Sequence, residues 1–224
     1  GLNRSSPVDA SIIATAVPIF VLLLAAVILK EPITRKKSFG VFMGVSGGLL
    51  LVFSSTHTAD SISSLDGDVM MIVSGLMYAI YLVLSKPLSL RYSSVTMMKW
   101  MFLFTTLTLV PFTFRHVLDA PAFHREVWDF KELSAIFYVL FGATFLPYLL
   151  IPMSLKRIRP TTVSMYNYVQ PIVASFIAVM VGQDTFSWQK FLSAILVFIG
   201  VYLVTQSKSR EDIDREQKSG ALNQ

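Results

Sequence analysis

The chain has 224 residues, a net charge of +5 and no cysteine. Because 54% of its residues are hydrophobic and only 15% are charged, against about 25% charged in soluble domains, the composition excludes an ordinary soluble protein. The lack of cysteine excludes disulfides, thiolate metal sites and thiol catalysis. We therefore expect a membrane protein.

Seven apolar runs approach the roughly 17–25 residues that a helix needs to cross about 30 Å of hydrocarbon. In chain order these predicted helices are 8–29, 39–53, 69–84, 95–114, 133–155, 161–181 and 191–205. The second, third and seventh are short, and they reach spanning length only with flanking Ser, Thr or Trp188. Strands of a membrane barrel alternate apolar and polar residues, whereas in these runs the odd and the even positions are both apolar. The pattern therefore predicts an all-α protein.

Lysine and arginine are distributed unequally between the two sides of the predicted spans. Fourteen of the nineteen lie on the side that holds the C-terminus. The positive-inside rule assigns that side to the cytoplasm and the start of this chain to the outside. We expect a multi-pass protein of the cytoplasmic (inner) membrane, in contact with the lipid bilayer. The unequal distribution of lysine and arginine accounts for the positive net charge, so we expect no nucleic acid as partner.

An internal repeat relates the two ends of the chain. Residues 7–52 and 160–205 align without a gap at an offset of 153 positions. Matching positions carry the same residue in several places: Pro7 and Pro160, Ser11 and Ser164, Pro18 and Pro171, Gly47 and Gly200. Equivalent spans are five apart, and because five is odd the second copy is inverted relative to the first, as in secondary transporters.

The repeat predicts the domain organisation. Residues 1–53 would be the last two helices of the first repeat, 54–68 an external loop, 69–206 the five-helix second repeat and 207–224 a cytoplasmic tail. The expected fold is thus a polytopic transmembrane helical bundle, an inverted 5+5 repeat with seven of ten spans in this sequence. Three further helices would precede Gly1.

Both copies resemble a known family. Their shared pattern lies in residues 6–7, 18–19 and 29–34 (LKEPIT) of the first copy and in residues 159–161, 170–172 and 200–201 of the second. These segments resemble the ends of two EamA domains of the drug/metabolite transporter superfamily. The resemblance implies ten helices, both termini inside and transport of small metabolites by alternating access. Asp184 departs from the pattern, because glutamate followed by proline is commoner there.

Polar residues gather in the sixth predicted span, just before Pro171. They are Ser164, Tyr166, Asn167, Tyr168 and Gln170. Because proline has no N–H, the carbonyl near Asn167 loses its partner, which favours a kink beside a cavity. We expect Ser164, Tyr166, Asn167 and Gln170 to bind substrate. The alternative is that they form hydrogen bonds between helices.

Pro18 is the repeat equivalent of Pro171, and Thr15 lies one turn before it. We expect Thr15 to join the substrate site, and Pro18 and Pro171 to act as hinges, although a proline in a membrane helix can also be a packing kink.

Two tyrosines in other spans are further candidates for the substrate site. Tyr148 lies in the fifth span, where Pro147 and Pro152 are expected to break the helix twice, and Tyr78 lies in the third. Both are expected at the same cavity. The alternative for tyrosines near span ends is anchoring at the membrane interface.

Gly40, Gly44 and Gly48 repeat every four residues in the second span. Such a face allows another backbone to approach closely. It could mediate a homodimer or pack against a helix of the same chain, and the sequence favours the second use.

Charged residues stand at the ends of the spans. Glu31, beside Lys30 and Arg35, is expected to form a salt bridge at a helix end. Lys99 is expected to reach the cytoplasmic interface.

Catalytic constellations are not found in the sequence. The three histidines, His57, His116 and His124, fall in predicted loops, and the last span has no lysine that could hold retinal. No serine–histidine or paired-aspartate arrangement lies within the spans, so we expect no catalytic residue, metal or cofactor. The predicted function is secondary transport of small, amino-acid-like or drug-like metabolites. The alternative is a membrane scaffold or sensor that transports nothing.

Overall fold

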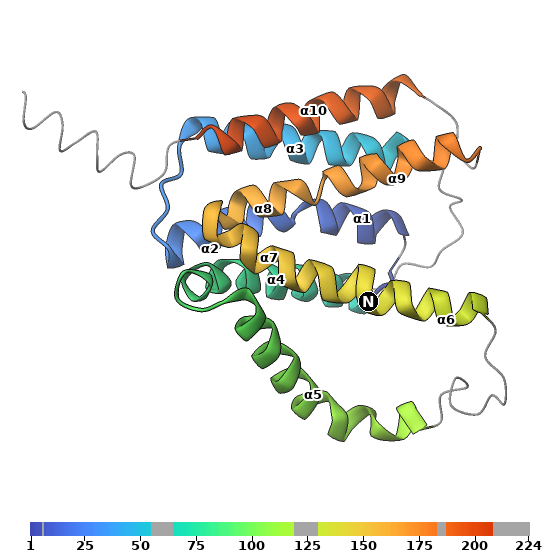
Figure 1. The fold of residues 1–224 in the computed structure, drawn as a ribbon. Coiled ribbons are helices and arrows are strands. Elements are labelled where there is room, and N and C mark those ends of the chain that lie inside the picture. Colours follow the sequence, from blue (N-terminus) through green and yellow to red (C-terminus); the bar gives the residue numbers. More distant parts are fainter. Residues whose placement is uncertain (6, 55–64, 119–129, 183–186, 208–224) are drawn as a thin grey trace, which may run out of the picture. The chain divides into compact units, whose positions relative to one another are not determined.

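The computed structural model describes residues 1–5, 7–54, 65–118, 130–182 and 187–207. It divides into two compact units, the first made of residues 1–84 and 158–224 and the second of residues 85–157. Figure 1 shows helices throughout the described ranges, which confirms the predicted all-α fold class.

Unit 1 contains the ends of the chain. Its helices are α1 (Pro7–Thr15), α2 (Val17–Ile28), α3 (Arg35–Ser54), most of α4 (Leu65–Arg91), α8 (Pro160–Tyr166), α9 (Val169–Met180) and α10 (Trp188–Thr205). Unit 2 contains the end of α4, followed by α5 (Ser94–Leu118), α6 (Phe130–Phe137), the π-helix η2 (Tyr138–Phe145) and α7 (Leu146–Arg157).

The predicted spans are present. Within the described residues, seven helical stretches are long and apolar enough to cross a membrane. The three short runs are lengthened, to Arg35–Phe53, Leu65–Arg91 and Trp188–Thr205. Polar side chains set two of these starts: Thr34 accepts a hydrogen bond from the Lys37 N–H (3.2 Å), and Ser187 accepts one from the Lys190 N–H (3.3 Å).

The turn between α2 and α3 holds a buried ion pair. Lys30 adopts a left-handed backbone conformation with a φ of 52°, which turns the chain after α2. Lys37 Nζ lies 2.6 Å from Glu31 Oε2, and the exposed fractions of the two side chains are 1% and 11%. The salt bridge expected for Glu31 therefore forms, with Lys37 one turn into α3 as its partner.

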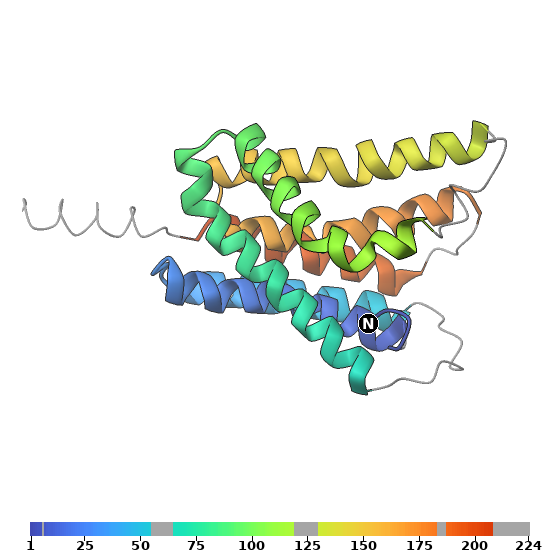
Figure 2. The same cartoon turned by 90° about the horizontal axis from the view of Figure 1, so that it is seen from below.

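The start of α4 is attached to the first residues of the chain. Ser5 Oγ donates a hydrogen bond of 2.5 Å to Asp68, and Gly67 lies against the backbone of Arg4 and Ser5. Figure 2 shows α4, in teal, slanting across the blue helices of the same unit. A Cβ on Gly75 would lie 3.2 Å from a methyl of Val17, so α4 also approaches α2 closely.

Helices α3 and α10 lie side by side in unit 1 (Figure 1). A Cβ on Gly200 would lie 2.6 Å from the Gly40 carbonyl oxygen, so only glycine fits there. Ser193 Oγ donates a buried hydrogen bond of 2.6 Å to the Gly47 carbonyl. These contacts join helices of one chain, which favours the packing alternative for the glycine face; homodimer formation stays a prediction.

The α3–α10 contact carries the symmetry of the repeat. At the offset of 153 positions, Gly40 corresponds to Ser193 and Gly47 to Gly200. The Gly40–Gly200 contact therefore exchanges with the Ser193–Gly47 contact when the two copies are exchanged. An approximate two-fold axis between inverted repeats requires that exchanging the copies turns each contact into the other. The pair of contacts therefore supports the repeat inferred from the sequence.

Unit 2 departs from the expected double break of the fifth span. The backbone N–H of Leu146 bonds to the Phe141 carbonyl, five residues back, in the wide π-helical turns that precede Pro147. Helix α7 then runs through Pro152 to Arg157 without interruption, so the break expected at Pro152 is wrong. The wider turns before Pro147 accommodate its missing N–H without ending the span.

Replacing Gly200 by Ala tests the close approach of α3 and α10. The added methyl would meet the backbone of Gly40 and Gly44, which cannot move without separating the helices. We expect a loss of about 1–3 kcal/mol in stability, measured as thermal unfolding of the detergent-purified protein. The control is Gly142→Ala, whose methyl would make an ordinary 3.4 Å contact with Tyr138. Equal melting temperatures for the two variants would contradict the tight contact.

Candidate functional site

The first predicted span is broken where Pro18 was expected to kink it. Helix α1 ends at Thr15 and α2 begins at Val17. The N–H of Ile19, which would reach Thr15 in a continuous helix, donates instead to the Ala16 carbonyl at 3.0 Å. The Thr15 carbonyl is thereby released from the ordinary helical ladder.

The equivalent span is broken at the matching place. Helix α8 ends at Tyr166 and α9 begins at Val169, two residues before Pro171. In the intervening turn the N–H of Asn167 bonds to Ser164 (3.1 Å) and that of Tyr168 to Met165, both three residues back instead of four. The predicted kink before Pro171 is present.

One hydrogen bond joins the two breaks. The Tyr168 hydroxyl donates to the Thr15 carbonyl, and the residues are buried, with exposed fractions of 4% and 8%. Thr15 and Tyr168 are 153 positions apart and are therefore each other's equivalents in the repeat. A contact between equivalent residues maps onto itself, so it lies on the approximate two-fold axis that relates the copies.

The Tyr168 ring occupies a space left by two glycines of α3. A Cβ on Gly44 would lie 3.0 Å from the ring, and one on Gly48 would lie 3.2 Å from it. Met165 and Tyr168 belong to the same buried apolar cluster, which also contains Leu22, Val41, Val197, Val201 and Val204. The tyrosine is thus held by α3 and by the core while its hydroxyl reaches across to the other repeat.

The predicted polar cluster divides by exposure. Ser164 is fully buried, and its hydroxyl donates to the Thr161 carbonyl at 2.8 Å, within its own helix. Tyr166 is half exposed, Gln170 is exposed and Asn167 is partly exposed. The phenol and the two amides are therefore the side chains of the cluster that are open to a ligand.

The other predicted residues lie in several places. The Thr15 hydroxyl donates to the Ile12 carbonyl (2.7 Å), within its own helix. Tyr78, on α4 in unit 1, has its ring 6.1 Å from that of Tyr81. Tyr148 is on α7 in unit 2, where its ring meets Phe102 edge-on at 5.4 Å. A common cavity for Tyr78, Tyr148 and the α8–α9 turn stays a prediction.

A cavity of about 360 Å³ opens just beyond Pro171, between α3, α9 and α10. It is lined by Leu51, Ile172, Ser175, Phe176, Val179, Lys190, Phe191 and Ala194. The predicted substrate residues do not line it. It is mainly apolar, with one hydroxyl and one ammonium group at its wall.

Tyr168 makes the contact between the repeats that the sequence did not predict. Its role depends on a backbone carbonyl that is remote in sequence, and no side-chain motif marks such a partner. The repeat itself held the signal, because Thr15 and Tyr168 occupy the same position in the two copies.

The site supplies hydrogen-bond donors and acceptors at two broken helices. Within the described ranges, no group of three His, Asp or Glu residues could hold a metal ion. Phenol, amide and backbone groups can bind a polar solute, and a broken helix can change its bend. Fold and site together define a multi-pass helical membrane protein built on an inverted repeat.

Comparison with known proteins gives the family. Residues 1–53 and 65–206 match the EamA-like transporter family, and the chain belongs to it. A transporter of Archaeoglobus fulgidus named as uncharacterized is 26% identical, over 91% of this chain and 68% of that protein. The similarly named YyaM of Bacillus subtilis is 27% identical, over 90% and 65%. The chain thus spans about two thirds of the length of these relatives.

Two further comparisons found similar proteins. The WAT1-related chloroplastic protein At3g02690 of Arabidopsis thaliana is 24% identical, over 91% of this chain and 49% of its own length. A solved crystal structure with 19% identity has a TM-score of 0.73, over 91% of this chain and 69% of that one. At that identity the likeness shows a shared fold.

Replacing Tyr168 by Phe tests the hydrogen bond on the symmetry axis. The variant keeps the ring in the core but leaves the Thr15 carbonyl without its donor, so we expect a loss of about 1 kcal/mol. For a chain of this size the melting temperature should fall by about 2–4 °C. The matched control is Tyr166→Phe, which changes a half-exposed phenol two residues away. A Tyr168→Phe variant as stable as the control would show that the bond contributes nothing.

Proposed function

We propose that the protein is a secondary transporter that moves small, amino-acid-like or drug-like metabolites across the cytoplasmic membrane by alternating access. Membership of the EamA-like transporter family and relatives named as transporters support transport as the general activity. The proposed orientation places the C-terminus in the cytoplasm, as the lysine and arginine distribution predicts.

The observation that carries this proposal is the meeting of two broken helices, one from each inverted repeat. The breaks at Thr15–Val17 and at Tyr166–Val169 are joined by the Tyr168–Thr15 hydrogen bond. In transporters with inverted repeats, discontinuous helices near the middle of the bilayer bind the solute, and one repeat moves against the other. Pro18 and Pro171 are the proposed hinges because each lies at the start of the helix that follows a break.

The proposed substrate contacts are Asn167, Gln170 and Tyr166, with Tyr78 and Tyr148 as further candidates. Amide and phenol groups are neutral, and each can both donate and accept hydrogen bonds. Such groups suit polar solutes that are neutral or zwitterionic, and the proposed substrate class reflects this. Ser164 and Thr15 contribute through the backbone turns that their hydroxyl groups stabilise.

Asn167→Ala and Gln170→Ala should weaken transport without disturbing the fold. Each removes one proposed hydrogen bond to substrate, so we expect about a fivefold higher half-saturation concentration for uptake by proteoliposomes of the intact protein. The control is Gln206→Ala, which truncates an exposed glutamine beyond the end of α10. Unchanged kinetics in both variants would remove these residues from the site. Absence of flux for every candidate metabolite in the unmodified protein would favour the scaffold or sensor alternative.

Pro18→Ala and Pro171→Ala test the hinges. Alanine restores an N–H that can bond four residues back, which favours a continuous helix across the break. We expect a several-fold lower maximal transport rate with little change in half-saturation concentration, because the change acts on the moving step. Pro152→Ala is the matched control, since α7 already runs through that proline. Equal rates in all three variants would contradict the hinge role.

A further inference from the structure

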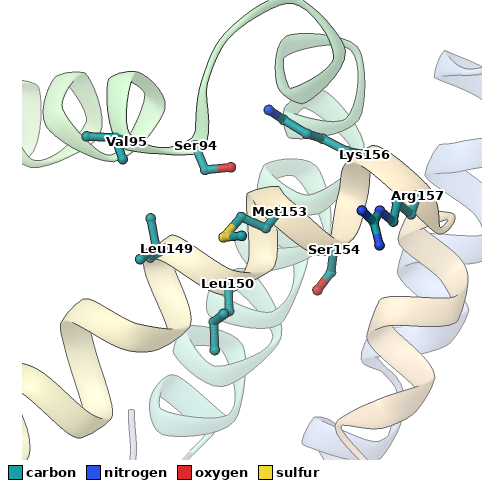
Figure 3. A pocket seen from close by; sticks show the side chains of 8 residues that line it. All are labelled: Ser94, Val95, Leu149, Leu150, Met153, Ser154, Lys156 and Arg157. Carbon is teal, nitrogen blue, oxygen red and sulfur yellow. The ribbon is translucent and has the colours of Figure 1, made fainter.

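A second cavity lies wholly within unit 2, between the start of α5 and the last turns of α7 (Figure 3). Its volume is about 590 Å³. It is lined by Ser94, Val95, Leu149, Leu150, Met153, Ser154, Lys156 and Arg157. None of these residues belongs to the proposed transport site, so the cavity calls for its own explanation.

One wall of this cavity is hydrocarbon. Leu149, Leu150 and Met153 follow one another along α7, and Val95 faces them from the first turn of α5 (Figure 3). Leu150 and Met153 are each 50% exposed, and Val95 is 61% exposed. The wall therefore offers apolar surface over little more than one helical turn, about 6 Å, which suits a segment of an alkyl chain.

The other end of the cavity is polar and positively charged. Ser94 is 6% exposed, and its Oγ is buried without a hydrogen-bond partner in the described structure. A buried hydroxyl without a partner indicates a ligand or water that completes it. Ser94 also begins α5, whose N-terminal end carries a partial positive charge, and α7 contributes Lys156 and Arg157 from its last turn.

Within the described residues, neither Lys156 nor Arg157 forms an ion pair with a carboxylate. The sequence has no Asp or Glu from residue 69 to 118 or from 133 to 183, so no carboxylate lies near in sequence to Lys156 or Arg157. The same stretches also contain Lys86, whose Nζ donates to the Leu155 carbonyl at 2.5 Å and so caps α7. Lys86 thus bonds the Leu155 carbonyl at the end of α7, and Lys156 and Arg157 are the cations at this cavity that could bind an external anion.

We propose that this cavity binds one anionic phospholipid. The phosphate accepts hydrogen bonds from Ser94, Lys156 and Arg157, and an acyl chain lies along Leu149, Leu150 and Met153. A soluble anion would match only the polar end, whereas a phospholipid matches both. Basic pockets between membrane helices on the cytoplasmic side are known to select such head groups. The cavity shares no residue with the proposed substrate contacts, and its placement in the cytoplasmic leaflet rests on the orientation proposed above.

Native mass spectrometry of the detergent-purified intact protein tests this binding directly. Dioleoyl phosphatidylglycerol is titrated in parallel with dioleoyl phosphatidylcholine, which has the same chains without net charge. We expect one phosphatidylglycerol to bind preferentially and Lys156→Gln/Arg157→Gln to weaken it by roughly 25-fold. Ser94→Ala should weaken it by about fivefold, because the phosphate loses one donor.

The matched control is Arg35→Gln/Lys36→Gln. It removes two exposed cations from the first turn of α3, on the same predicted side of the membrane but in unit 1. Unchanged affinity in this control supports the site, and an equal loss in both double variants overturns it in favour of general surface attraction. Displacement of the lipid by millimolar inorganic phosphate or glycerol 3-phosphate would overturn the lipid assignment. The assay requires no transport, so its result is independent of the proposed function.

Discussion

A break in a membrane helix releases backbone carbonyls, and hydrocarbon offers those carbonyls no partner. This constraint governs the centre of unit 1, where two spans break at equivalent places. The carbonyl of Thr15 is satisfied by the Tyr168 hydroxyl of the other repeat. The Tyr168 hydroxyl of one repeat therefore stabilises the break between α1 and α2 in the other.

That contact needs the close approach of neighbouring helices. Gly44 and Gly48 leave room for the Tyr168 ring. Gly40 and Gly200, which have no side chains, allow the backbones of α3 and α10 to come into contact. Small residues drive such packing in lipid because no hydrophobic gain accompanies the meeting of two apolar helices. The glycines of α3 thus serve two neighbours at once, since they face α10 at one position and the broken helix at the next.

The sequence predicted the fold more completely than the site. Span length located the seven candidate membrane spans of the described residues, because the apolar length of a segment is a local property. Prolines were less informative: Pro18 and Pro171 each follow a break, whereas α7 continues through Pro152. Whether a freed carbonyl breaks a helix depends on neighbours that are distant in sequence. For the same reason Tyr168, bonded to the backbone of another helix, could not be distinguished from Tyr166, which is half exposed.

The hydrogen bond on the approximate two-fold axis also bears on how such a protein diverges. A pair of equivalent residues that meet on an axis would be identical in a dimer of two equal halves, and two tyrosines or two threonines would face each other there. Here one copy supplies a phenol and the other a backbone carbonyl with a small side chain. Likewise Ser193 donates to a carbonyl, while its equivalent, Gly40, has no side chain to donate. Joining both halves in one chain permits this division of roles.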